Sequence, residues 1–398
     1  MKSDVHPVFH AASAMTGRLR RVPLPYPVAL VLGGLLLGAL HLFSAPHLTR
    51  GLLFSIFLPG LLFEAAFHIP VAEFWGNRLT IAALAVPGVI ISAALVALVL
   101  PPAVHLLNIS TGFGWSYALV FGALISATDP IAVIGLFRTV GAPRRLRLLV
   151  EVESLLNDGT SIVFFTMSLA LLDGTPVSAA PIALQFLAVV GVAALLGAVI
   201  GLAGAAIMRR FRRPLLWIVV TLPVAYGSFV AAEALGYSGV IATVTAGMLC
   251  GSSVRLRGAA ARCHATTDTF WKSVAFGLNS VVFLLIGLTV HMRVLGAFWV
   301  PVLVAFAVVT GSRALVVGAS RTLVAHTREH FPWRWTPVLI WGGLRGALPM
   351  VLALSLPASF SYRELIIAMT FGVALLSIVL QGLTMLPLLR RLALQAPP

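Results

Sequence analysis

The sequence predicts an all-helical membrane protein with many spans. Of its 398 residues, 60% are hydrophobic and only 10% are charged, and the mean hydropathy is +1.03. Such a chain has too little polar surface to cover a water-soluble globule, but it suits helices surrounded by lipid. Apolar runs long enough to cross a bilayer recur from residue 24 to residue 390. We therefore expect one transmembrane domain, 24–390, after an N-terminal lead at 1–22.

About twelve segments are predicted to cross the membrane, taking roughly 20 apolar residues as the length of a helical span. The eighth is short and suits a tilted or re-entrant piece. Small residues at the spacing Gly34-x-x-x-Gly38 and Gly197-x-x-x-Gly201 suit close contacts between helices. The segments are 24–43, 51–69, 79–103, 115–137, 149–172, 181–207, 215–235, 238–250, 270–290, 297–320, 335–357 and 364–389.

Basic residues fall mainly on one side of these segments. The lead and the loops after even-numbered segments hold 21 Lys and Arg, whereas the opposite loops hold only Arg50, Arg293 and Arg363. Since cytoplasmic loops carry such an excess, both termini are predicted to be cytoplasmic, in a cell (inner) membrane. The lead has no apolar core, so it does not have the pattern of a cleavable signal peptide.

The composition also argues against two other classes of protein. The net charge of +15 does not indicate nucleic-acid binding, because the basic residues are scattered between apolar spans instead of forming a patch on a soluble fold. Cys250 and Cys263 offer neither a disulfide framework nor metal-ligand spacing. No enzyme motif, metal or organic cofactor is implied.

Ionisable residues inside the spans are the most informative feature. Each is costly in hydrocarbon unless it is paired or hydrated, so together they indicate an ion or proton path. Segment 5 carries a polar stripe, because Ser154 and Asp158 share one helix face and Glu153 and Asn157 share the next. The buried ionisable side chains are predicted to be Glu64, Asp129, Glu151, Glu153, Asp158, Arg313 and Arg345.

Two prolines predict helix breaks beside these charges. Pro130 follows Thr128-Asp129 in segment 4, and Pro349 follows Gly342-Gly-Leu-Arg-Gly in segment 11. A proline removes one N–H and clashes with the carbonyl four residues earlier. A pair of interrupted helices in corresponding halves is typical of a transporter's ion site at the membrane midplane. The correspondence between halves is complete only if one further helix precedes residue 24.

Five short motifs follow one another along the chain: Ser-Ala-Thr-Asp-Pro-Ile-Ala-Val at 126–133, Glu-Ser-Leu-Leu-Asn-Asp-Gly-Thr at 153–160, Phe-Leu-Leu-Ile-Gly at 283–287, Ser-Arg-Ala at 312–314 and Gly-Gly-Leu-Arg-Gly-Ala at 342–347. In these motifs the chain resembles the monovalent cation/proton antiporters, in the branch of bacterial and eukaryotic sodium/proton exchangers. The resemblance implies an inverted-repeat fold with two crossing broken helices, working as a homodimer in the lipid bilayer. The resemblance implies thirteen helices, so the family's first helix is expected to be absent from this sequence.

The resemblance also implies roles for domains and residues. A core, 79–172 and 297–390, would move against a scaffold, 24–69 and 181–290. Asp158 would bind a proton or a monovalent cation such as Na⁺, with Ser154, Thr128 and the backbone at Asp129 as further ligands, and Asn157 would belong to the same binding site. Glu153 would pair with Arg313, and Glu64 would approach from the scaffold. Arg345 lies in the second broken helix.

These roles predict exchange of Na⁺, Li⁺ or K⁺ for H⁺ by competition at Asp158. A carboxylate must lose its proton to hold a cation, which couples the two ions through one side chain. Asn157 does not titrate, so one proton exchanges for one cation without net charge movement. Two alternatives remain open: an inverted-repeat transporter in which helix N-termini and arginines bind an organic anion, and a truncated sensor without transport.

Overall fold

The computed structural model describes residues 26–40, 51, 53–107, 112–172, 179–211, 213–255, 261–289 and 296–394. Within these ranges all regular structure is helical. The predicted N-terminal lead, 1–22, lies outside them. An all-helical fold is what the composition predicts, because backbone polar groups in lipid must find partners within their own segment.

In the residues that the structure describes, the first half of the chain has eight α-helices and a short π-helical entry to α4. They are α2 (Tyr26–Ala39), η1 (Leu53–Phe57), α4 (Leu58–His68), α5 (Val71–Gly76), α6 (Arg78–Ala85), α7 (Pro87–Leu106), α8 (Trp115–Ile125), α9 (Ile131–Val140) and α10 (Arg144–Leu172).

The second half begins with four long helices and ends with a second interrupted pair. Its described elements are α11 (Ala179–Arg210), α12 (Pro214–Ala234), α13 (Gly239–Arg255), α14 (Ala261–Thr289), α16 (Trp299–Val324), η2 (Trp333–Trp335), α17 (Thr336–Trp341), α18 (Ala347–Leu354), α19 (Arg363–Leu376), η3 (Ser377–Gln381) and α20 (Gly382–Arg391).

Every predicted segment overlaps one of these helices or two to three consecutive ones. Seven helical stretches in the described part are long and apolar enough to cross a membrane, and four further apolar helices are shorter. The count of twelve spans therefore stays a prediction, although the all-helical polytopic class is confirmed. The seven are 78–106, 144–172, 184–210, 214–234, 262–288, 299–324 and 363–391.

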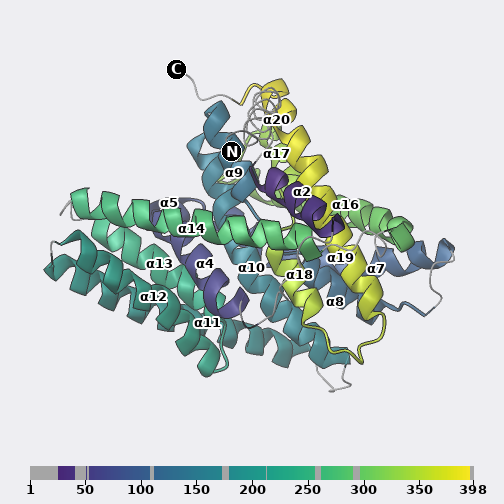
Figure 1. Cartoon of the computed structure of the whole chain (residues 1–398), viewed down its shortest axis with the longest axis horizontal. Coiled ribbons are helices and arrows are strands. Elements are labelled where there is room, and N and C mark those ends of the chain that lie inside the picture. Colours follow the sequence, from purple (N-terminus) through teal and green to yellow (C-terminus); the bar gives the residue numbers. More distant parts are fainter. Residues whose placement is uncertain are drawn as a thin grey trace, which may run out of the picture.

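The helices form two groups (Figure 1). In one group, α11, α12 and α13 pack together, α13 packs on α4, and α14 packs on α2. In the other, α7 packs on α8 and α16, α8 packs on α10, and α19 packs on α16 and α18. We call them the α11–α14 group and the α7–α19 group. Helix α10 belongs to the second group and also contacts α4 and α13, so it lies along the boundary.

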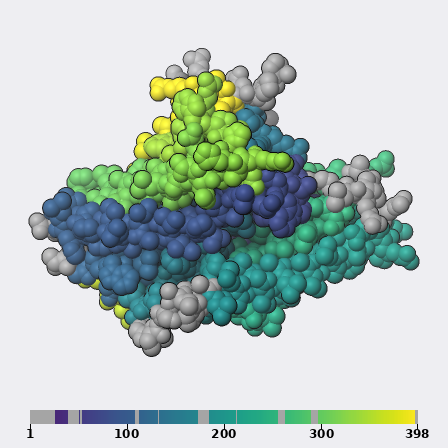
Figure 2. All heavy atoms as spheres, turned by 180° about the vertical axis from the view of Figure 1, so that it is seen from behind, coloured from purple at the N-terminus to yellow at the C-terminus, as the bar shows by residue number. Residues whose placement is uncertain are grey.

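Figure 2 shows the same division from behind. The segment near residues 300–330, in light green, lies beside the blue segment near 80–105, and the teal helices flank them below. The contact between α16 and α7 includes a hydrogen bond of 2.9 Å between the Ser312 and Ser92 hydroxyls. Two distant parts of the sequence are thus joined inside the α7–α19 group.

Small residues permit the closest helix contacts. A Cβ on Gly197 would lie 2.1 Å from the carbonyl oxygen of Ala242, and one on Gly201 would lie 2.5 Å from that of Ala246. The predicted contact of Gly197 and Gly201 is therefore confirmed, between α11 and α13. Gly34 likewise faces α14, where a Cβ would lie 2.2 Å from the Leu284 carbonyl oxygen.

Both predicted helix breaks are present. The chain leaves helical geometry between α8 and α9, at residues 126–130, and between α17 and α18, at residues 342–346. Pro130 immediately precedes α9 and Pro349 lies in the first turn of α18. At these positions a proline lacks only an N–H that has no partner within the helix. Each proline therefore starts the second half of an interrupted helix.

Two predicted segments were shorter than the helices that the structure shows. Helix α13 continues to Arg255 and α14 begins at Ala261, although the sequence predicted an end at 250 and a start at 270. Polar residues extend both helices beyond their apolar runs. This is possible because an α-helix makes its backbone hydrogen bonds within itself and can continue from lipid into water at the membrane surface. The extension adds Asp268 to α14, and it places Lys272 inside the helix instead of at its edge.

Candidate functional site

The polar stripe of α10 points into the α7–α19 group. Glu153, Ser154 and Asn157 are buried, with 1–3% of their surface exposed, while Asp158 is partly exposed. This arrangement follows from helical spacing, which turns residues 153, 154, 157 and 158 toward one side. The stripe therefore combines three enclosed polar side chains with one carboxylate that solvent can reach.

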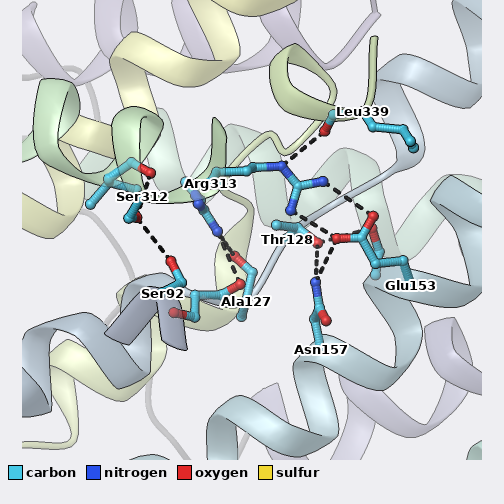
Figure 3. A network of polar contacts seen from close by, with 12 residues as sticks. Ser92, Ala127, Thr128, Glu153, Asn157, Ser312, Arg313 and Leu339 are labelled. Atoms are coloured by element: carbon cyan, nitrogen blue, oxygen red, sulfur yellow. Dashed lines mark hydrogen bonds and ion pairs between the residues drawn. The ribbon is translucent and has the colours of Figure 1, made fainter. Parts of the chain in front are cut away.

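Asn157 and Ser154 meet Thr128 in the first helix break. The Thr128 hydroxyl donates to the Ser154 hydroxyl at 3.0 Å. The Asn157 amide donates to Glu153 Oε1 at 3.1 Å and to the Thr128 hydroxyl at 3.4 Å (Figure 3). These bonds tie α10 to the broken segment.

Arg313 on α16 forms a buried ion pair with Glu153. Its guanidinium donates to both carboxylate oxygens, at 2.8 and 3.2 Å, and to the Leu339 carbonyl at 2.9 Å. Figure 3 shows the side chain bridging α10 and the end of α17. A two-point contact of this kind fixes orientation as well as charge. Glu153 is therefore already neutralised within the protein.

Arg345 lies in the second helix break, between α17 and α18, and stabilises the first break, between α8 and α9. Its guanidinium donates to the carbonyls of Ser126 and Ala127, at 3.0 and 3.2 Å, and its backbone N–H donates to the Ser377 hydroxyl at 3.0 Å. Carbonyls that a broken helix leaves without a backbone partner thus receive one from a buried cation.

Asp129 stabilises the start of α9. Its Oδ1 accepts the Ile131 N–H at 2.9 Å. A carboxylate at this point also interacts favourably with the positive end of the helix dipole. The side chain lies close enough to Asp158 for the two carboxylates to interact electrostatically.

Asp158, Asp129 and Thr128 line a cavity of about 120 Å³ between the two helix groups. From the α11–α14 group, Glu64 on α4 and Asn279 on α14 line its opposite wall. Of the residues predicted for the site, the cavity brings four together: Asp158, Asp129, Thr128 and Glu64. Ser154 and Asn157 are not on its wall; each lies one hydrogen bond behind Thr128. Neither arginine reaches it, and both line a separate pocket of about 20 Å³.

Behind the cavity, Glu64 continues into a chain of ionisable side chains. The ring of His68 lies 2.7 Å from the Glu64 carbonyl oxygen through Nδ1, and its Nε2 contacts the carboxylate of Asp268. Lys272 donates to the other Asp268 oxygen at 2.6 Å. The chain runs from the cavity toward the exposed Lys272.

Asn279, His68 and the contact between Ser92 and Ser312 were not predicted from the sequence. Asn279 is a polar residue in the apolar run that precedes Phe283-Leu-Leu-Ile-Gly, and that was its only signal. His68 stands four residues after Glu64, which places both on one helix face. The partners of these residues lie on distant segments.

Comparison with known proteins gives a consistent result. The family model described as "Sodium/hydrogen exchanger, transmembrane" matches residues 8–391. The Na(+)/H(+) antiporter ApNhaP of Aphanothece halophytica is 36% identical over 375 residues, which are 93% of this chain and 70% of that protein. The Na(+)/H(+) antiporter NhaG of Bacillus atrophaeus is 34% identical over 410 residues, covering 98% and 76% of the two chains.

The fold is similar to that of a solved structure as well. The sodium proton antiporter MjNhaP1 of Methanocaldococcus jannaschii, determined at pH 8, superposes with a TM-score of 0.75 at 20% identity. The match covers 97% of this chain and 96% of that one. With the family match over nearly the whole sequence, these findings lead to one conclusion: the chain is a multi-pass membrane protein and a member of the transmembrane sodium/hydrogen exchanger family.

Proposed function

We propose that this protein is a secondary active transporter that exchanges Na⁺, or Li⁺ or K⁺, for H⁺ by alternate binding at Asp158. The observation that carries the proposal is the wall of the cavity. There the carboxylate of Asp158, from the α10 stripe, lines the same cavity as the carboxylate of Asp129 at the helix break and the oxygens of Thr128. Oxygen ligands of this type suit hard monovalent cations.

Asp158 is the carboxylate best placed to alternate between its protonated and its ionised form. Glu153 is occupied by Arg313, and Asp129 accepts the N–H that begins α9. Because a cation needs the ionised form of Asp158 and a proton removes it, the two ions compete for one site. Ser154 would serve the cation through its contact with Thr128, and Asn157 would hold that contact in place.

The proposed architecture assigns movement to the boundary between the helix groups. The core would comprise segments 79–172 and 297–390, and the scaffold 24–69 and 181–290. The cavity lies between these groups, so sliding of one against the other would expose Asp158 to either side in turn. We further propose a homodimer in the cell (inner) membrane with both termini cytoplasmic, which the distribution of basic residues supports.

The organic-anion alternative has less support. Such a carrier would need a cationic group at its binding cavity, but Arg313 and Arg345 donate to groups of the protein and line a different pocket. The polar side chains at the cavity include three carboxylates and an amide. A site of this charge favours a cation.

The test is transport by the purified protein in liposomes. Internal pH is followed with a trapped dye while Na⁺, Li⁺, K⁺ or choline is added outside. The proposal expects alkalinisation or acidification that depends on the alkali cation and follows its gradient, with no response to choline. A protein that is inserted and folded but gives equal traces for all four salts would contradict the proposal.

A further inference from the structure

The two walls of the cavity differ in character. The wall from the α7–α19 group carries Thr128, Asp129 and Asp158. The wall from α4 and α14 is mostly apolar, and two polar side chains interrupt it, Glu64 and Asn279. Glu64 has its own neighbours in His68 and the residues behind it. Asn279 is therefore the polar group of this wall that still needs an explanation.

Asn279 is a buried amide that faces the cavity without a partner. Only 8% of its surface is exposed, and its side chain makes no hydrogen bond to the part of the chain that the structure describes. The other enclosed asparagines make hydrogen bonds: Asn157 donates to two side chains, with only its Oδ1 lacking a partner, and Asn77 donates to a carbonyl and accepts from Arg145. Burying a polar side chain without a partner is costly. The amide is open to the cavity, so whatever enters there, water or an ion, supplies its partner.

A monovalent cation fits the chemistry of this position. The oxygen of a carboxamide is a hard ligand, and asparagine carbonyls serve as cation ligands in proteins. Being neutral, Asn279 adds a ligand without adding a second titratable charge. The cation would then have oxygens on both sides of the cavity, Asp158 and Thr128 on one and Asn279 on the other.

We propose that Asn279 is a cation-binding residue contributed by α14, on the opposite side of the cavity from Asp158. The inference rests on the proposed function and deepens it. It names a ligand that belongs to the other helix group, so that a bound cation links the two groups directly. Removing the amide oxygen weakens cation binding and leaves the proton reaction of Asp158 in place.

The experiment compares Asn279→Ala with Val282→Ala in the same liposome assay. Val282 also lies on α14 and lines the same cavity, so its truncation enlarges the cavity without removing an oxygen. We expect Asn279→Ala to raise the Na⁺ concentration for half-maximal exchange about tenfold, as expected for the loss of one contact to a charged group. The maximal rate changes little. Val282→Ala stays within about twofold of the unmodified protein.

Two further variants keep the result interpretable. Asn279→Gln retains the carboxamide and is expected to restore part of the affinity, whereas Asn279→Leu has similar volume without an oxygen and is expected to behave like Asn279→Ala. The leucine variant also carries the test if the alanine variant does not fold. Thermal stabilisation of each purified variant by Na⁺ relative to choline provides a second measure of binding.

The proposal is overturned if Asn279→Ala and Asn279→Leu show the same Na⁺ dependence as the unmodified protein, or the same dependence as Val282→Ala. This outcome leaves the proposed function intact, since the unmodified protein still exchanges cations for protons. If the unmodified protein itself gives no cation-dependent pH change, the proposed function fails first, and the retained Na⁺ stabilisation assay still reports on Asn279.

Discussion

The backbone N–H of Asp129 donates a hydrogen bond of 2.7 Å to the carbonyl oxygen of Leu344. Asp129 lies in the break between α8 and α9, and Leu344 lies in the break between α17 and α18. Each break frees polar backbone groups that lipid cannot satisfy, and here one break supplies a partner for the other. The two interrupted helices are therefore held together where they cross.

This crossing predicts a strong effect of Gly346→Ala. A Cβ at Gly346 would lie 2.5 Å from the Cβ of Asp129 and 2.6 Å from its Oδ2, closer than packed atoms permit. The broken segments must separate, at a cost of about 1–3 kcal/mol for an overpacked interior. We expect a lower melting temperature in detergent and loss of most exchange. Gly318→Ala on α16 is the control, because a Cβ there meets no atom within 4 Å; equal behaviour of the two variants would contradict the fixed crossing.

The ion pair of Glu153 and Arg313 is predicted to be structural. Removing one member leaves the other charged and buried, which costs roughly 3–5 kcal/mol, whereas removing both is close to neutral. Glu153→Gln and Arg313→Gln should therefore each melt earlier than the double variant. The measurement is a double-mutant cycle of thermal stability in detergent. Destabilisation of the double variant by the sum of the two single effects would show that the residues do not act as a pair.

How much of this structure the sequence predicts depends on the range of the interaction. Local features were predictable: Pro130 and Pro349 indicated the two breaks, and helical spacing indicated the stripe around Asp158. The residues that line the cavity could not be predicted. One of its walls comes from α4 and α14, and nothing in the sequence around Asn279 shows which side of α14 faces Asp158. The contact of His68 with Asp268 also joins residues far apart in sequence. Helix ends were misjudged where polar residues at 261–269 continue α14.

Exchange is predicted to be electroneutral. Asn157 does not titrate and Glu153 is neutralised by Arg313, so Asp158 alone cycles between a proton and a monovalent cation. Any net charge carried across would contribute about 2.3 kcal/mol per 100 mV of membrane potential. The measurement imposes potassium diffusion potentials with valinomycin on sodium-loaded liposomes and follows internal pH. A rate or end point that shifts systematically with voltage would show that a second charge moves.

The most direct test of alternate occupancy at Asp158 is to count protons released when Na⁺ binds. Purified protein in weakly buffered detergent solution is titrated with NaCl or choline chloride between pH 6 and pH 9, and the pH change is recorded. The account predicts release of up to one proton per chain on addition of Na⁺, none with choline, and none from a folded Asp158→Asn variant. Two results would contradict alternate occupancy at Asp158. One is proton release from the Asp158→Asn variant equal to that of the unmodified protein. The other is saturable Na⁺ binding by the unmodified protein with no proton release anywhere between pH 6 and pH 9.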